Sequence, residues 1–212
     1  MAHSENLRSF LLFFKEALLH PWSAGTFFPS SQHLAKAMAR PVPIDGTGLV
    51  VEVGAGTGAV TRALLGSGIQ PERLVIVERS PVLAASLRAR FPQLRIVQGD
   101  ARNIGWFLRQ HSRIDAIVSS VPLRSLPYAE SESIVEHWRA VLPVETLIIQ
   151  YTYALYGPPR HLTNGFVQLS SEITWRNLPP ARILTLRCLA PDSVPASSEE
   201  QLEAQRVTAS GG

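Results

Sequence analysis

One stretch decides the fold, and it reads Leu49-Val50-Val51-Glu52-Val53-Gly54-Ala55-Gly56-Thr57-Gly58. Its apolar half is typical of a fully buried strand in a parallel sheet. The glycines that follow allow positive backbone φ angles and a close approach to a ligand, because they carry no Cβ. The sequence predicts a helix over 57–67, and the N–H groups of its first turn point at the same place. A nucleotide-like ligand is therefore expected at this turn.

Two cofactor classes fit the glycine turn. Residues 54–59 match the dinucleotide pattern G-x-G-x-x-A. Residues 52–58 match E-x-G-x-G-x-G, which resembles motif I of the class I S-adenosylmethionine (SAM) methyltransferases. Glu52 favours the second interpretation, because a carboxylate repels a pyrophosphate but attracts the cationic sulfonium and amino groups of SAM. A purely structural alternative is a tight strand-to-helix turn in which Glu52 pairs with a neighbouring arginine.

Two further acids stand at the ends of predicted strands. The run 74–78 ends in Glu78, about 20 residues after the glycines, as in a β-α-β unit whose second acid accepts the ribose hydroxyls. The run 94–101 ends in Gly99-Asp100-Ala101, which resembles the methyltransferase motif that binds the adenine amino group. Three acids at successive strand ends lie where an open α/β sheet binds its ligand. The predicted cofactor is SAM, with S-adenosylhomocysteine as its product. The predicted cofactor-binding residues are Glu52, Gly54, Ala55, Gly56, Thr57, Gly58, Glu78, Arg79, Gly99, Asp100, Ala101 and Ser119.

The composition indicates one folded domain without a metal centre. The chain has 212 residues, 45% of them hydrophobic, and its single cysteine, Cys188, is expected in the core of a strand. The histidines are scattered without the spacing of a zinc site, so no metal is predicted. Of the 20 basic residues only Lys15 and Lys36 are lysines. Because arginine binds phosphate bidentately, this excess fits an anionic partner, although arginine-rich codon usage explains it equally well.

An amphipathic helix is predicted within the first 20 residues. Apolar side chains recur at helical spacing from Leu7 to Leu18, and Pro21 ends the segment. The segment is too short and too charged to span a bilayer, which takes about 20 apolar residues. It also lacks the cleavage site of a signal peptide. It is either a core helix docked on the sheet or an interfacial helix that lies among lipid headgroups.

The remaining chain alternates between strands and helices. Further helices are predicted over 30–40 (with Ser30 or Ser31 as N-cap), 81–90, 104–110 and 128–141. Further strands are predicted over 114–120 and 146–154, and a closing hairpin is predicted around a turn at 177–180.

This order predicts an α/β fold, with the seven-stranded Rossmann-like sheet of class I SAM methyltransferases and an antiparallel last strand. The expected division has three parts. Residues 1–45 form an N-terminal helical membrane-binding or lid segment, residues 46–190 the SAM-dependent methyltransferase domain, and residues 191–212 a disordered tail.

From about Phe10 to Cys188 the chain resembles the small bacterial phospholipid N-methyltransferases, which make phosphatidylcholine from phosphatidylethanolamine. The amphipathic helix contributes to this resemblance. The other motifs are Pro29-Ser30-Ser31-x-x-Leu34-Ala35-x-Ala37-Met38, Ser119-Ser120-Val121-Pro122-Leu123, and Gln150-Tyr151-Thr152-Tyr153 with Trp175-Arg176-Asn177-Leu178-Pro179-Pro180. The chain departs from the family at Ser120 and Val121, where glycine and leucine are usual.

The resemblance implies methyl transfer from SAM to the amino group of phosphatidylethanolamine and its mono- and dimethyl forms. Tyr151 and Tyr153 are predicted to steady the ammonium through cation–π contacts and hydrogen bonds, with strand packing as the alternative. Candidates for holding the lipid phosphate are Arg124, Arg160 and Arg176, with solvated surface positions as the alternative.

The predicted protein is cytoplasmic and attached peripherally to the inner face of the cell membrane. Residues 5–19 are predicted to contact an anionic membrane surface, and the phospholipid is the predicted substrate. No nucleic-acid partner is predicted, and no oligomeric state is predicted.

Two other functions fit parts of the sequence. Ribosomal RNA adenine dimethyltransferases share the fold and the basic character, but they carry an Asn-Leu-Pro-Tyr motif whose amide and ring hold a flipped base. Residues 119–123 contain neither group, and only a short tail stands where those enzymes have a helical RNA-binding domain. The other alternative is a SAM-fold membrane adaptor without catalysis, against which the intact glycines and acids argue.

Overall fold

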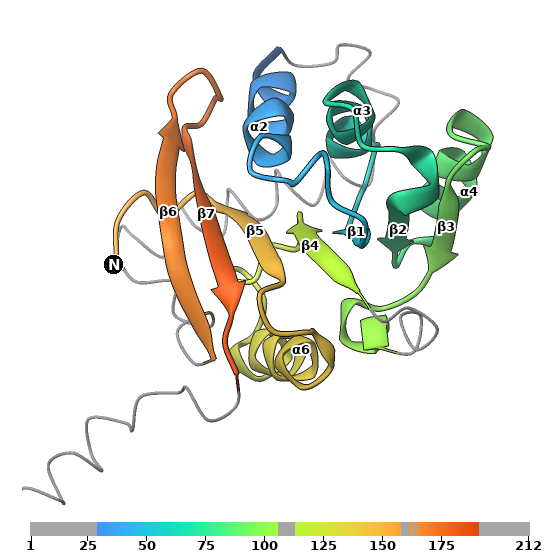
Figure 1. The fold of residues 1–212 in the computed structure, drawn as a ribbon. Coiled ribbons are helices and arrows are strands. Elements are labelled where there is room, and N and C mark those ends of the chain that lie inside the picture. The colour runs from blue at the N-terminus through green and yellow to red at the C-terminus, as the bar shows by residue number, and fades with distance from the viewer. Residues whose placement is uncertain (1–28, 106–112, 158–161, 163–164, 191–212) are drawn as a thin grey trace, which may run out of the picture.

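The computed structural model describes residues 29–105, 113–157, 162 and 165–190, with side chains from residue 32 onward. Seven strands form one mixed sheet in the order β3-β2-β1-β4-β5-β7-β6 (Figure 1). The strands are β1 (Leu49–Val53), β2 (Leu74–Glu78), β3 (Arg95–Gln98), β4 (Ile114–Ser119), β5 (Leu147–Thr152), β6 (Phe166–Thr174) and β7 (Ala181–Cys188). Neighbours among β1 to β5 pair in parallel, whereas β7 is antiparallel to both β5 and β6. The predicted seven-stranded sheet with an antiparallel last strand is confirmed.

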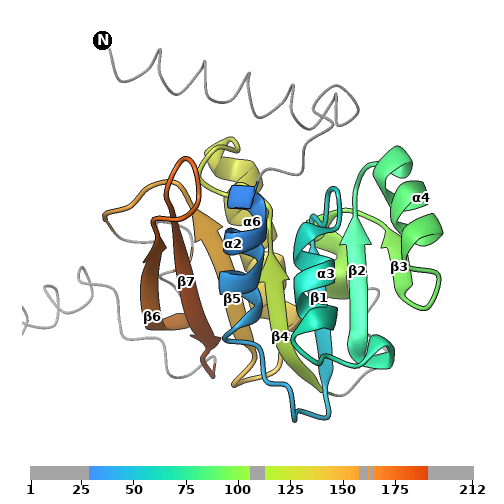
Figure 2. The same ribbon diagram turned by 90° about the horizontal axis from the view of Figure 1, so that it is seen from above.

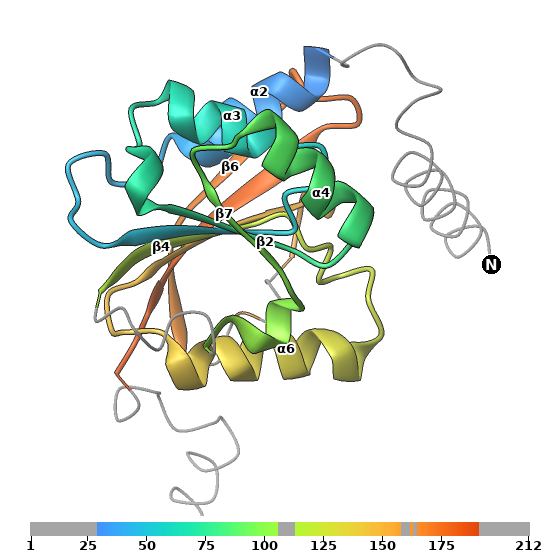
Figure 3. The ribbon, with the colours of Figure 1, turned by 90° about the vertical axis from the view of Figure 1, so that its right-hand side faces the viewer.

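Helices cover both faces of this sheet. Figure 3 shows α2, α3 and α4 on one face and α6 on the other. Their bounds are Pro29–Ala39 for α2, Ala59–Gly66 for α3, Pro81–Arg90 for α4 and Tyr128–Val141 for α6, with short 3-10 helices at Pro71–Arg73 and Ala101–Asn103. Every residue of β1 and β2 is buried because these strands are covered from both sides. Their nearly continuous apolar sequences follow from that burial.

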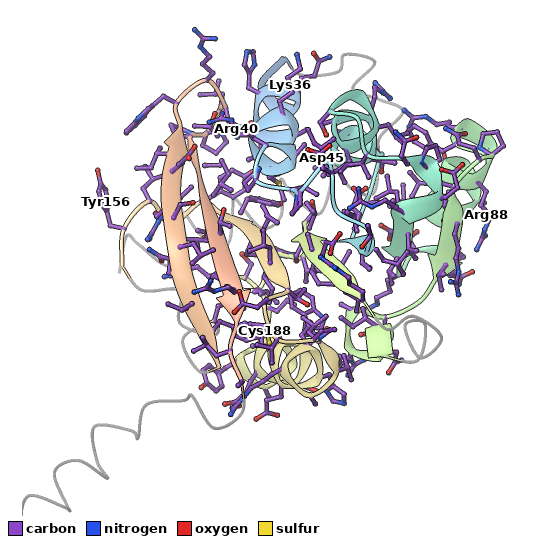
Figure 4. All side chains as sticks on the ribbon, viewed as in Figure 1. Lys36, Arg40, Asp45, Arg88, Tyr156 and Cys188 are labelled. Atoms are coloured by element: carbon purple, nitrogen blue, oxygen red, sulfur yellow. The ribbon has the colours of Figure 1, made fainter. Side chains whose placement is uncertain are left out.

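Two hydrophobic cores result, one on each face. On the face of α2, Met38 and Leu64 pack with Val50 of β1, and Leu87 of α4 belongs to the same cluster. On the face of α6, Trp138 is the largest buried side chain of its cluster. Cys188 is buried there with a free thiol, as predicted, and Figure 4 shows it beside α6. Each core binds its helices firmly to the strands, so the strand ends are held in fixed register.

The predicted helices over 81–90 and 128–141 are confirmed at both ends. The first described helix begins at Pro29, so Ser30 and Ser31 lie in its first turn, and their prediction as N-cap is wrong. Proline is well suited to a first helical turn because its φ is already helical and its missing N–H is not needed there. This helix packs on α3, β5, β6 and β7, so the part of residues 1–45 that the structure describes shares the core of the sheet.

The closing hairpin is longer than predicted. β6 begins at Phe166 and β7 ends at Cys188, and a register irregularity lies between Gln168 and Ser170. This irregularity breaks the strict alternation that sequence patterning detects. Residues 1–28, most of the predicted helix over 104–110, and the tail at 191–212 lie outside the described residues.

The parallel strands point toward one edge of the sheet, which we call the carboxyl edge (Figure 2). The turn between β6 and β7 lies at the same edge, because β6 runs in the direction of β5. Within the described ranges, no helix is long and apolar enough to cross a membrane. Open α/β sheets bind ligands outside the carboxyl ends of their strands, so this edge is where a site is expected.

Candidate active site

The glycine turn after β1 combines two different uses of glycine. Gly58 caps α3 with a φ of 76°, and a Cβ there would meet Phe91 and Leu87 of the neighbouring helix at 2.8 and 2.9 Å. Gly56 has a φ of 55°, and a Cβ there would meet nothing within 4 Å. Gly58 is therefore needed for packing, whereas Gly56 exposes its backbone to open space that a ligand can approach.

Glu52 is fully buried beneath α3. Its Oε2 accepts a hydrogen bond from Thr61 Oγ1 at 2.7 Å, while its Oε1 has no hydrogen-bond partner among the described residues. Burial raises the pKa of Glu52 to about 8, the Thr61 hydrogen bonds oppose this shift, and the charge of Glu78 adds to it. A buried acceptor atom without a donor is costly, and it marks a place where a cationic donor group binds favourably.

Glu78 joins the end of β2 to the glycine turn. One carboxylate oxygen accepts the backbone N–H of Gly56 at 2.9 Å, and the other accepts that of Ser80 at 2.8 Å. Gly99, after β3, donates its N–H to the carbonyl of Glu78 at 3.0 Å. These bonds bring three strand ends together as the sequence predicted. The guanidinium of Arg79, the residue after Glu78, pairs with Glu130 of α6 at 3.4 Å, and its positive charge also helps to lower the pKa of Asp100.

Asp100 is held by a residue that the sequence did not indicate. Arg102 donates from Nε and Nη2 to the two carboxylate oxygens, each at 2.9 Å, and its backbone N–H binds the same group. The side-chain hydrogen bond from Arg102 is the main reason that the pKa of Asp100 is lowered. Trp138 of α6 donates to the carbonyl of Ala101 at 2.8 Å. The carboxylate is therefore charged and fixed in position at the carboxyl edge.

Gln150 fixes the loop after β4, a role that sequence reasoning missed. Its Nε2 donates to the carbonyls of Val121 and Tyr151, both at 2.9 Å, and its buried Oε1 has no partner among the described residues. It pairs in register with Ser119, which is buried and whose Oγ accepts the N–H of Val121. A glutamine inside an otherwise apolar strand is the signal that points to such a role. Thr61 carries a comparable signal, because it is a polar residue on the apolar face of a helix.

The two candidate tyrosines form a pair at the end of β5. Their ring centroids lie 5.5 Å apart in an edge-on arrangement. Tyr151 is buried in the core cluster under α2, whereas Tyr153 is partly buried and hydrogen-bonds the side chain of Asn177 in the β6–β7 turn. Burial raises the pKa of both phenols, so both stay protonated at neutral pH.

The candidate phosphate-binding arginines lie on separate loops. Arg124 is exposed in the loop after β4, and Arg176 is exposed in the turn between β6 and β7. Arg160 lies outside the described residues. Among the residues with described positions, no group of three or more side chains is arranged to hold a metal ion.

The arrangement fits SAM better than a dinucleotide. A buried carboxyl with an unpartnered oxygen stands behind the turn, Gly56 leaves its backbone open, and Glu78 and Asp100 stand at the next two strand ends. All three acids favour a cationic ligand with hydroxyl and amino donors, and a pyrophosphate would be repelled. When bound, SAM supplies an electrophilic methyl group, and the residues described here would hold it.

Asp100→Ala is expected to weaken SAM binding by roughly tenfold or more, because one charged hydrogen-bond acceptor is lost. The fold should remain intact, since the hydrogen bonds described for the Asp100 carboxylate all come from Arg102 within its own loop. Titration calorimetry with SAM, together with thermal unfolding, measures both effects. Arg102→Ala is the matched control, which keeps the carboxylate and should lose much less affinity. Unchanged affinity in Asp100→Ala contradicts this role.

Comparisons with known proteins agree with the site. A family described as "Methyltransferase domain" matches residues 50–144. The ornithine lipid N-methyltransferase of Singulisphaera acidiphila is 29% identical over 181 residues, which cover 82% of this chain and 94% of that protein. The ribosomal RNA small subunit methyltransferase A of Maridesulfovibrio salexigens is 31% identical, but over only 47% of this chain and 37% of that protein.

Solved structures show the same fold. The N-methyltransferase NodS from Bradyrhizobium japonicum, in complex with S-adenosyl-L-homocysteine, superposes with a TM-score of 0.62. It is 14% identical, and the match covers 79% of this chain and 91% of that chain.

Fold, site and sequence together define a class I SAM-dependent methyltransferase. Its cofactor is SAM. Within this class, the predicted resemblance to lipid N-methyltransferases is confirmed by the match that covers nearly the whole of the ornithine lipid enzyme.

Proposed function

We propose that this enzyme transfers methyl groups from SAM to the amino group of phosphatidylethanolamine and its mono- and dimethyl forms, giving phosphatidylcholine. The observation that carries the lipid amine as acceptor is the similarity to an ornithine lipid N-methyltransferase along 94% of that protein. The choice of phosphatidylethanolamine as the particular lipid amine is the more specific part of the proposal. It is supported by the motifs at 150–153 and 175–180, which resemble those of phospholipid N-methyltransferases.

The proposed acceptor site lies at the ends of β4 and β5. Methyl transfer to an amine is an in-line displacement, which needs alignment of the two reactants and an unprotonated amine. Tyr151 and Tyr153 are proposed to hold the amine through ring faces and hydroxyl oxygens. Because both phenols stay protonated, they orient the amine and do not remove its proton. Arg124 and Arg176 supply positive charge from two loops, and Arg160 is proposed with them for the lipid phosphate.

The proposed place of the reaction is the inner face of the cell membrane, with the enzyme attached peripherally from the cytoplasm. Residues 5–19, whose sequence is amphipathic, are proposed to contact the anionic lipid surface. The substrate of such an enzyme is held in the bilayer, so attachment of this kind brings the site to its acceptor.

Incubation of the full chain with methyl-labelled SAM and separated acceptors tests the acceptor. We expect label in mono-, di- and trimethylated phosphatidylethanolamine, read by chromatography of the extracted lipids. Parallel reactions contain ornithine lipid or bacterial ribosomal RNA. The Asp100→Ala variant is the control for labelling that does not depend on the SAM site. Label in ornithine lipid alone replaces the proposed acceptor with another lipid amine, and label in RNA alone overturns the lipid function.

A further inference from the structure

Two large apolar side chains project from the turn between β6 and β7. Leu178 is 83% exposed and Trp175 is 66% exposed, and no described large apolar side chain is more exposed than Leu178. Exposing such side chains to water is unfavourable, and two of them within one short turn indicate a contact surface. We call residues 175–180 the hairpin tip.

The hairpin tip is held in a defined shape from inside. Asn177, between the two exposed residues, is buried, and its Nδ2 donates to the carbonyl of Pro179 at 2.6 Å. The same side chain hydrogen-bonds Tyr153 at the end of β5. Burial of the polar residue and exposure of its apolar neighbours reverse the usual pattern of a surface turn. The tip is therefore fixed to the proposed acceptor site while its apolar side chains face away from the protein.

A second exposed aromatic residue lies beside this hairpin. Tyr156, in the loop after β5, is 78% exposed, and Figure 4 shows its side chain directed away from the protein beside β6. Arg182 at the start of β7 fastens this loop to the hairpin, because it donates to the carbonyl of Gly157 and to Ser171 Oγ, both at 2.6 Å. The loop is thus joined to the hairpin close to the hairpin tip.

The chemistry of this surface matches the headgroup region of a bilayer. Tryptophan and tyrosine are enriched at membrane interfaces, and leucine reaches the acyl boundary. Arg176 and Arg182 add positive charge beside them, which anionic lipids attract. A second copy of the chain is a poorer partner, because stable protein interfaces bury about 800 Å² on each side and two side chains on a protruding turn supply far less.

We propose that the hairpin tip inserts Trp175 and Leu178 into the surface of an anionic bilayer, which places the end of β5 against the membrane. The proposal rests on the proposed lipid function and gives it an orientation: the carboxyl edge faces the lipid. Asn177 is the link between the inserted turn and Tyr153.

The test uses a polarity-sensitive fluorophore on a cysteine introduced by Trp175→Cys in the full chain. The native Cys188 is buried and labels poorly. We expect a blue shift of the dye emission on vesicles rich in phosphatidylglycerol, with a smaller shift on vesicles of phosphatidylcholine alone. Neither SAM nor phosphatidylethanolamine is present, so the result does not depend on catalysis. Val144→Cys, at the opposite edge of the sheet, is the labelled control and should not shift.

Each outcome of these measurements either supports or overturns the proposed membrane contact of the hairpin tip. An unshifted dye at position 175 on a chain that sediments with the vesicles overturns the proposal, and so does a chain that does not sediment with them. A shift that grows with protein concentration without vesicles identifies a protein contact and also overturns it. A double variant, Trp175→Ser with Leu178→Ser, should lower vesicle partitioning at least about tenfold and leave SAM affinity unchanged. Ile44→Ser with Val144→Ser is its control. Absence of lipid methylation with a shifted dye removes the proposed function and leaves the membrane contact standing.

Discussion

In the ligand-free wild-type protein, the free energy of unfolding is expected to fall between about pH 5 and pH 8. In the Glu52→Gln variant, this fall should disappear. The folded protein keeps the Glu52 proton until about pH 8, whereas the unfolded chain releases it near pH 4.5. Between these values the folded state binds more protons, so the free energy of unfolding falls as the pH rises. The stabilising contribution of the protonated Glu52 side chain is complete below the pKa of the unfolded chain, and it is lost as the pH rises to the pKa of the folded protein. The expected loss is roughly 4 kcal/mol.

Urea unfolding of the ligand-free protein at several pH values measures this effect. Glutamine keeps an oxygen that can accept the Thr61 hydroxyl but cannot ionise, so its stability curve should be nearly flat over the same range. The extra N–H groups of the amide add a constant cost at every pH, which changes the height of the curve and not its slope. Glu72→Gln, at an exposed position, is the control. Parallel slopes in wild type and Glu52→Gln contradict the buried, protonated state of Glu52.

The same variant should weaken SAM binding, because the cationic ligand favours the charged carboxylate. We expect a loss of affinity of roughly tenfold or more at pH 8. We also expect wild-type affinity to rise from pH 6.5 to pH 8 as the carboxylate forms, and the affinity of Glu52→Gln to stay constant. Calorimetric titration at the two pH values separates these cases. Equal affinities in the two proteins at pH 8 exclude Glu52 from the cofactor site.

The sequence predicted the part of the site that is encoded locally. The glycine turn, Glu78 and Asp100 each stand at a strand end, and strand ends are marked by the change from apolar residues to glycine and acid. The structure brings these segments together through Gly56, Glu78 and Gly99. The sheet order follows from the alternation of strands and helices, because right-handed crossovers leave few other arrangements.

What the sequence did not predict depends on contacts between distant residues. Nothing in the local pattern places Thr61 on Glu52 or Gln150 on the carbonyl of Val121, since each bond joins separate elements. The burial that raises the pKa of Glu52 comes from α3 packing over β1, which a linear pattern does not show. Arg102 is only two residues from Asp100, but arginines are so frequent in this chain that one more gave no signal.

The hairpin tip shows that the exposure of a side chain, like its burial, is not predicted by a linear sequence pattern. The sequence predicts a turn at 177–180 and a family-like motif over 175–180, but exposure is a property of the folded molecule. Only the structure shows that Asn177 is the buried member and that Trp175 and Leu178 face outward. The acceptor assignment therefore depends on residues whose roles arise from the tertiary fold, whereas the cofactor assignment depends on a short contiguous motif.

Gly56→Ala is expected to abolish most SAM binding with only a small loss of stability. Its φ of 55° costs an alanine about 1–2 kcal/mol, and its Cβ meets no protein atom within 4 Å, so no clash is added. The same Cβ fills the open space against the backbone where a ligand would approach. We expect the dissociation constant for SAM to rise by roughly a hundredfold or more, because close backbone approach is lost.

Two matched glycines separate ligand binding from backbone strain. Gly157 has a φ of 88° and equally open surroundings, so Gly157→Ala should cost similar stability and leave SAM affinity unchanged. Gly58→Ala should lose more stability than either, since its Cβ meets Phe91 and Leu87 at under 3 Å. Thermal unfolding and calorimetric titration of the three variants give both quantities for each. If Gly56→Ala and Gly157→Ala bind SAM equally well, the open backbone at Gly56 is not the cofactor's place, and the glycine turn serves only to join β1 to α3.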